Sequence, residues 1–177
     1  MLMFRMMWKD WGFADSLFSQ AQAFLDLANA APRDKASEAY IRATIIFSQM
    51  AFEAYFRSVV RGYIQQHRPT IPSASLEKVE LAIERNTGIS VAVRDWPKWL
   101  TGNSLDTEDA LYRNFTNFIQ YRNALVHGAI TAKIASWGRL AQDVETTDYA
   151  ALAQTTTIGM VKVVAAHFDF TTPAWAA

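Results

Sequence analysis

A long helical pattern covers residues 35–66 and constrains the fold more than any other part of the chain. The segment contains no proline and a single glycine, and its apolar side chains recur at intervals of three, four and seven residues: Ile41, Ile45, Phe52, Phe56, Val59 and Tyr63. This spacing places them on one face of an α-helix. A helix with one apolar face must bury that face against another element, and strand patterns are weak throughout the sequence. The segment therefore predicts a protein built from packed helices.

Four further segments follow helical patterns, so we expect about five helices in all. The predicted helices span residues 14–30, 35–66, 75–86, 105–126 and 148–167. Asp34 and Asp106 are the expected N-caps of the second and fourth, and Glu108 and Asp109 place negative charge in the first turn of the fourth. Residues 89–103, around Pro97, are predicted to be irregular with a short helical turn, and residues 128–147 show no clear pattern. We expect one all-α domain over residues 1–177, an up-and-down helical bundle with antiparallel neighbours.

The composition supports a packed globule, with 51% hydrophobic and 13% aromatic residues. Because the net charge is zero, any contact with RNA must use a local basic patch rather than global attraction. The absence of cysteine excludes disulfides, thiolate zinc sites and thiol catalysis, and fits a cytoplasmic protein. Three histidines without an HExxH pair argue against a protein-built metal site, so we expect no metal and no cofactor.

The first eleven residues are apolar but are interrupted by Arg5 and Lys9. They contain no apolar run long enough to span a membrane and no small-residue cleavage site of a secretory signal. A short Met-, Trp- and Phe-rich segment of this kind docks on its own fold or on a dimer mate more often than on a bilayer. We therefore expect no membrane partner, with attachment to a membrane surface as the alternative.

Residues 122–127, of sequence RNALVH, carry the strongest chemical signal. The Arg122 guanidinium stays charged at any working pH and matches phosphate oxygens with forked donors. The His127 imidazole has a reference pKa of about 6.5 and can exchange a proton near neutrality. Asn123 and His127 lie one helical turn apart, but Arg122 and His127 diverge by roughly 140° on a straight helix. One copy of the motif therefore does not enclose a phosphate, whereas two copies around a twofold axis can, which predicts a homodimer.

Arg122 also interrupts an apolar stripe formed by Leu111, Phe115, Phe118 and Leu125. A charge on such a stripe must find a partner, a cleft or an interface, because burying it alone costs several kcal/mol.

The chain offers an internal comparison, since residues 112–114 repeat the Tyr-Arg-Asn of residues 121–123. The earlier copy has Phe118 where the later one has His127, so only the later copy carries an acid–base group. A purely structural interpretation remains open: Arg122 can pair with a helix carboxylate, and His127 can cap the helix beside Gly128.

Charged residues on the 35–66 helix allow two interpretations. Glu53 and Arg57 are one turn apart and are expected to form an intrahelical pair. Alternatively, Glu53 points inward and orients Arg122. Arg57, Arg61 and Arg68 make a loose basic row that is either a solvated face or a contact for RNA phosphates.

Two tryptophans, Trp96 and Trp99, can stack on nucleobases or seal the core. The second role is commoner for tryptophans in connecting segments, and it is the role expected here.

The motif at residues 122–128 resembles the R-x4-6-H motif, with a polar residue after the arginine, of the HEPN superfamily (higher eukaryotes and prokaryotes nucleotide-binding domains). The succession of a long, a short, a motif-bearing and a C-terminal helix is similar, and residues 48–56 (SQMAFEAYF) look like the second helix of many bacterial members. The resemblance covers roughly residues 34–167. It implies an all-α, HEPN-like bundle that dimerises so that two motifs face one cleft.

Many proteins of this superfamily are metal-independent endoribonucleases of toxin–antitoxin, phage-defence or RNA-processing systems. The resemblance implies that Arg122 binds the scissile phosphate, His127 moves a proton and Asn123 orients either group, with RNA, a second copy and a cognate antitoxin as partners. The products would be a 2′,3′-cyclic phosphate and a 5′-OH. Some toxin subfamilies carry a modifiable tyrosine two residues past the histidine, where this chain has Ala129. The alternative is a non-catalytic HEPN module that binds a nucleotide or a partner protein.

Overall fold

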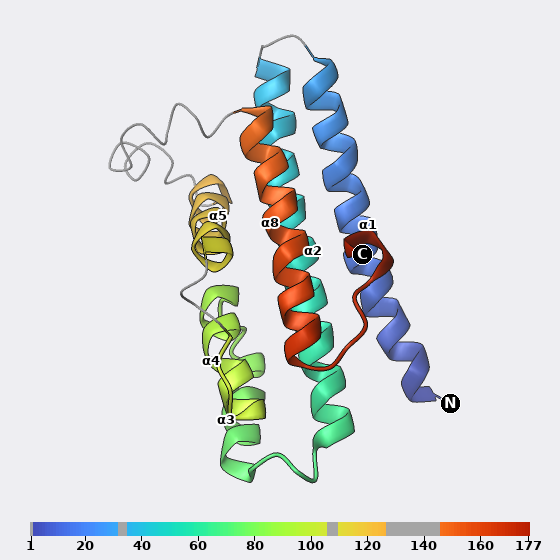
Figure 1. The fold of residues 1–177 in the computed structure, drawn as a ribbon, viewed down its shortest axis with the longest axis vertical. Helices are drawn as coiled ribbons and strands as arrows, with labels where there is room; N and C mark the ends of the chain where they lie inside the picture. Colours follow the sequence, from blue (N-terminus) through green and yellow to red (C-terminus); the bar gives the residue numbers. More distant parts are fainter. Residues whose placement is uncertain (1, 32–34, 106–109, 127–145) are drawn as a thin grey trace.

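The computed structural model describes residues 2–31, 35–105, 110–126 and 146–177. These residues form helices and contain no strand, which confirms the prediction of an all-α helical bundle. Six α-helices and a short 3-10 helix follow one another: α1 (Leu2–Ala30), α2 (Lys35–His67), α3 (Ser73–Glu84), α4 (Ile89–Thr101), α5 (Ala110–Val126), α8 (Thr147–His167) and η2 (Ala174–Ala176). In Figure 1 the long helices α1, α2 and α8 stand side by side, α5 lies beside α8, and α3 and α4 lie below α5.

Helix α2 is the centre of the bundle, because it packs against α1, α4, α5 and α8. The apolar face predicted from its sequence is buried, with Phe52, Phe56 and Val59 fully inaccessible to solvent. Phe52 meets Phe115 of α5 edge-to-face, with ring centroids 4.4 Å apart. This contact fixes α5 against the middle of α2, which is the position that matters for Arg122.

The C-terminal segment returns to the N-terminal helix. Trp175 of η2 stacks on Phe18 of α1 at 4.6 Å and meets Tyr55 of α2 edge-to-face at 6.3 Å. Aromatic pairs of this kind contribute about 0.5–1.5 kcal/mol beyond the burial of their area. The end of the chain therefore helps to hold α1 on α2.

Helices α2 and α8 begin and end close to their predicted positions, but α1 begins at Leu2 rather than near residue 14. No proline interrupts residues 2–30, and Gly12 costs only about 1 kcal/mol relative to alanine in a helix. Helix α5 is described from Ala110 to Val126, and Leu105, the predicted first residue, is not helical. The predicted first-turn residues 106–109, and the predicted cap Asp34, lie outside the described residues.

The prediction of irregular structure over residues 89–103 was wrong, because α4 is a regular helix with Pro97 inside it. A proline in a helix interior costs about 3 kcal/mol. The opposing term is burial of a continuous apolar face, formed by Ile89, Ala92, Val93, Trp96, Pro97 and Leu100. The helix ends at Gly102, whose φ of 83° lies in the left-handed region and whose N–H bonds to the carbonyl of Lys98.

Trp96 confirms the expected structural role of the α4 tryptophans. It is fully buried and stacks on Phe56 with ring centroids 5.9 Å apart. Trp99 is half-buried and packs against the same core. Among the described residues, no helix is long and apolar enough to cross a membrane.

Candidate functional site

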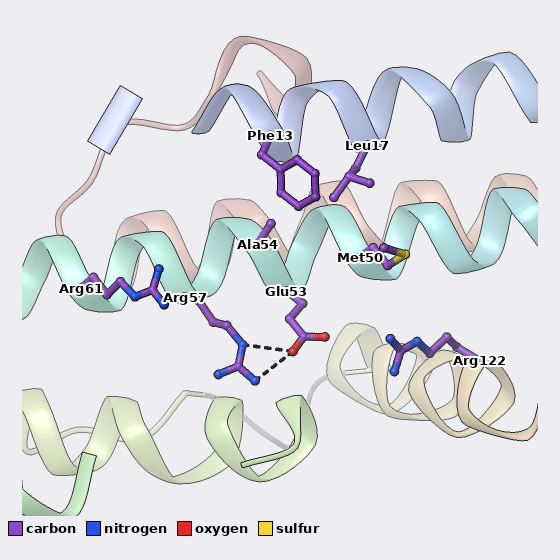
Figure 2. Close-up of a pocket in the computed structure, with 8 residues that line it drawn as sticks. All are labelled: Phe13, Leu17, Met50, Glu53, Ala54, Arg57, Arg61 and Arg122. Atoms are coloured by element: carbon purple, nitrogen blue, oxygen red, sulfur yellow. Dashed lines mark hydrogen bonds and ion pairs between the residues drawn. The ribbon is translucent and has the colours of Figure 1, made fainter. Parts of the chain in front are cut away.

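Arg122 lies where α5 faces α2, at the position that the apolar stripe leaves open. On this stripe Phe115 and Phe118 are buried, and Leu111 and Leu125 are half-buried. Arg122 itself is half-buried, and Figure 2 shows its guanidinium directed from α5 toward Glu53 of α2. Of the three outcomes expected for a charge on this stripe, the structure shows a cleft.

The cleft consists of two cavities on either side of Glu53. The first, which we call the apolar cavity, has a volume of about 280 Å³ and is lined by Phe13, Leu17, Met50, Glu53, Ala54, Arg57, Arg61 and Arg122. The second, the polar cavity, has a volume of about 220 Å³ and is lined by Glu53, Arg57, Asn86, Gly88, Ile89, Ser90, Ile119, Arg122 and Asn123. Three charged residues are common to both walls: Glu53, Arg57 and Arg122.

Arg57 is held in place by three different contacts. Its Nε and Nη2 donate hydrogen bonds of 3.0 and 2.9 Å to Oε1 of Glu53, as expected for an intrahelical pair one turn apart. Nη2 also donates to the carbonyl oxygen of Thr87 at 2.9 Å, and the guanidinium carbon lies 5.7 Å from the centre of the Trp96 ring. These contacts join α2 to the α3–α4 connection and make Arg57 a fixed part of the cavity wall.

Arg122 is held less completely. Its Nη1 donates a 3.1 Å hydrogen bond to Oδ1 of Asn123, the next residue along α5. Its Nε is buried and has no hydrogen-bond partner among the described residues. A buried donor without a partner costs about 1–3 kcal/mol, and more when the group is charged. A bound anion at this point would supply the missing acceptor.

The predicted basic row does not act as one surface. Arg57 and Arg61 line the apolar cavity, where Arg61 is exposed. Arg68 forms an exposed ion pair with Glu80 of α3, with 2.9 Å between Nη1 and Oε1. Exposed pairs of this kind contribute little to stability. Arg68 is therefore part of a solvated face, and the candidate site retains three arginines, Arg57, Arg61 and Arg122.

The structure brings together two of the three predicted catalytic residues. Arg122 and Asn123 line the polar cavity side by side. His127 lies outside the described residues, so its place relative to Arg122 stays a prediction. The earlier copy of the motif is different in kind: Arg113 is exposed and lines neither of the two cavities, and Phe118, at the position of His127, belongs to the core.

Several lining residues were not predicted from the sequence. Phe13 precedes the expected start of α1, Asn86 lies in the α3–α4 connection, and Ser90 lies in the first turn of α4. A sequence signal for the α2 wall did exist. Four of its lining residues recur at intervals of three and four along the helix, which is the spacing of one helical face: Met50, Glu53, Arg57 and Arg61.

The charge balance of the cleft favours an anion. Three arginines and one carboxylate line the apolar cavity, a formal excess of two positive charges (3 − 1). Arginine forks match phosphate and carboxylate oxygens bidentately. Among the described residues, no group of three His, Cys, Asp or Glu side chains is arranged to hold a metal ion.

No family model, no curated protein and no solved structure matches this chain. What the protein does must therefore be inferred from its own residues and their geometry.

Proposed function

We propose that this protein is a metal-independent endoribonuclease that cleaves RNA by attack of a ribose 2′-OH on the adjacent phosphate. The observation that carries the proposal is the state of Arg122. Its charged side chain is half-buried where two cavities meet, and its buried Nε has no partner among the described residues. The resemblance of residues 122–128 to the HEPN motif supports the same assignment.

The proposed reaction uses three side chains. The 2′-oxygen forms a bond to phosphorus as the bond to the 5′-oxygen breaks, which leaves a 2′,3′-cyclic phosphate and a 5′-OH. Arg122 binds the phosphate and stabilises the negative charge that its oxygens gain in the transition state. His127 removes the proton from the 2′-OH or delivers one to the leaving 5′-oxygen, and Asn123 orients the phosphate or the imidazole. Because the nucleophile belongs to the substrate, positioning and proton transfer suffice and no ion is required.

We propose that the active form is a homodimer in which two motifs face one cleft. On one helix Arg122 and His127 diverge by roughly 140°, so a second copy must complete the surroundings of the phosphate. Two copies also supply two imidazoles, one for each proton that moves. A cytoplasmic toxin–antitoxin or phage-defence role, with an antitoxin protein as the controlling partner, is the setting that the resemblance suggests.

A second candidate is a non-catalytic module that binds a nucleotide or a partner protein. One observation favours it: the described residues that line the two cavities include three arginines, the amides of Asn86 and Asn123 and the hydroxyl of Ser90, which are groups that bind a nucleotide. Such groups can hold a nucleotide without moving a proton.

Cleavage chemistry separates the two candidates. Purified protein should cleave a 5′-labelled single-stranded RNA in excess EDTA and leave a fragment that ends in a 2′,3′-cyclic phosphate, detected by its sensitivity to acid. Activity that chelation abolishes and Mg²⁺ restores would contradict the proposed mechanism. Tight binding of RNA or nucleotide without any cleavage would favour the non-catalytic module.

A further inference from the structure

The two cavities share charged residues but differ in the rest of their walls. Apart from Glu53 and the arginines, the apolar cavity is lined by Phe13, Leu17, Met50 and Ala54. The polar cavity presents the amides of Asn86 and Asn123 and the hydroxyl of Ser90. Arg122 lines both cavities, so a ligand that it holds has an apolar space on one side and hydrogen-bonding groups on the other.

We propose that the apolar cavity is a nucleobase subsite, in which the base attached to the phosphate at Arg122 stacks on Phe13. This inference rests on the proposed function and specifies how the RNA lies: its base enters between α1 and α2, and its sugar–phosphate faces the polar cavity.

Phe13 is placed as a stacking platform rather than as a core residue. It is 57% exposed, whereas Leu17, one turn further along α1, is 3% exposed. In Figure 2 both side chains project from α1 toward α2, with Ala54 and Met50 beyond them. A phenyl ring that stays largely in water at the mouth of a cavity lacks much of the stabilisation that its burial would give. A planar ligand that covers the ring would recover this free energy.

The rest of the cavity wall suits a base. Single-stranded RNA is recognised through bases that stack on aromatic rings and on arginine guanidinium planes. Arg57, Arg61 and Arg122 provide such planes around the same space. Met50 is unbranched and polarizable, and side chains of this type adapt to partners of different shape. A floor of Leu17, Met50 and Ala54 has no side-chain hydrogen-bond donor, so we expect weak discrimination among bases.

Arg122 lines the apolar cavity as well as the polar one, and this favours a nucleobase over another apolar occupant. A nucleotide carries its phosphate and its base on one sugar, so a single nucleotide can satisfy the unpartnered Nε and fill the apolar cavity at the same time. An apolar segment from a second copy of the chain would fill the cavity but would leave the guanidinium without its acceptor.

The test uses a fluorescein-labelled, 2′-O-methyl oligonucleotide, which lacks the attacking hydroxyl and cannot be cleaved. Binding is measured by anisotropy for the intact oligonucleotide and for a series with one abasic nucleotide at each position. The wild type is compared with Phe13→Ala and Phe13→Tyr, and with Leu27→Ala as control. Leu27 is an exposed residue of the same helix and lines neither cavity.

Phe13→Ala should weaken binding of the intact oligonucleotide by roughly 5- to 150-fold, the range for loss of one stacked base. One abasic oligonucleotide, the one that the wild type binds most weakly, lacks the base that stacks on Phe13. Phe13→Ala should bind this oligonucleotide with the same affinity as the wild type does. Phe13→Tyr and Leu27→Ala should bind like wild type.

Three results would overturn the inference. If Phe13→Ala binds the 2′-O-methyl oligonucleotide and cleaves unmodified RNA as the wild type does, the proposed function stands but the base subsite is ruled out. A change in sedimenting mass without a change in binding would assign the apolar cavity to a second copy of the chain. Wild type that neither binds nor cleaves any of the RNAs would remove the proposed function itself.

Discussion

Both hydrogen bonds that Arg57 donates to Glu53 end on the same carboxylate oxygen, Oε1, at 3.0 and 2.9 Å. Together with the Thr87 carbonyl and the Trp96 ring, they determine the position of Arg57. Arg122 lines the same two cavities, yet its buried Nε has no partner among the described residues. The two arginines therefore differ: Arg57 is held in the wall by its own contacts, and Arg122 is the one that we propose binds the phosphate.

Arg57→Lys should destabilise the fold by about 1–2 kcal/mol, because an ammonium group cannot reproduce the forked bonds to Glu53, the bond to Thr87 and the stacking on Trp96. Arg68→Lys is the matched control, since its pair with Glu80 is exposed and should change stability by less than about 0.5 kcal/mol. Urea denaturation of both variants measures the difference. Equal stability of the two would show that the Arg57 contacts do not hold α2 to the α3–α4 connection.

His167 should make stability depend on pH. Its Nε2 lies within hydrogen-bond distance of Oγ1 of Thr101, at 3.0 Å. Burial lowers the pKa of His167 below its ordinary value of 6.5, because the charged form is poorly solvated there. The unfolded chain therefore binds a proton at a higher pH than the folded protein.

Neutral His167 therefore contributes fully to the free energy of unfolding above pH 6.5. This contribution is lost as the pH falls from 6.5 through the pKa of the folded state. The melting temperature of the wild type should fall as the pH is lowered below about 6.5, and that of His167→Gln should fall less because glutamine does not titrate. His67→Gln serves as the control for replacing a histidine, since His67 is exposed at the end of α2. An identical slope in wild type and His167→Gln would rule out His167 as the cause.

The sequence was sufficient to predict the helices whose pattern is long and uninterrupted. The bounds of α2 and α8 agree with the predicted ones, because an apolar pattern that continues over five or more turns indicates a helix clearly. Helix α4 was not predicted, because Pro97 argues against a helix in the sequence. The opposing effect is the burial of an apolar face, and it depends on packing such as that of Trp96 on Phe56. Local signals could not show this, because the partner residue comes from another helix.

For the site, the position of Arg122 on an apolar stripe predicted a partner, a cleft or an interface, and the structure shows a cleft. The residues that shape it could not be predicted in the same way. Phe13 precedes the expected start of α1, and Asn86 and Ser90 reach the cleft only through the packing of the α3–α4 connection. The role of His127, the dimer and the HEPN relationship remain predictions.

The most direct test of the central claim is the rate of RNA cleavage by Arg122→Ala and His127→Ala, compared with Arg113→Ala from the earlier copy of the motif. Loss of the phosphate contact or of the proton-transfer group should each reduce the rate by about 10²–10⁴. Arg113→Ala should cleave like wild type and lose less than about 0.5 kcal/mol of stability. Circular dichroism and sedimentation, with an expected mass of twice 19.9 kDa for the dimer, establish that each variant is folded and assembled. Selective loss in the first two variants is the predicted result, and equal cleavage by all three would contradict it.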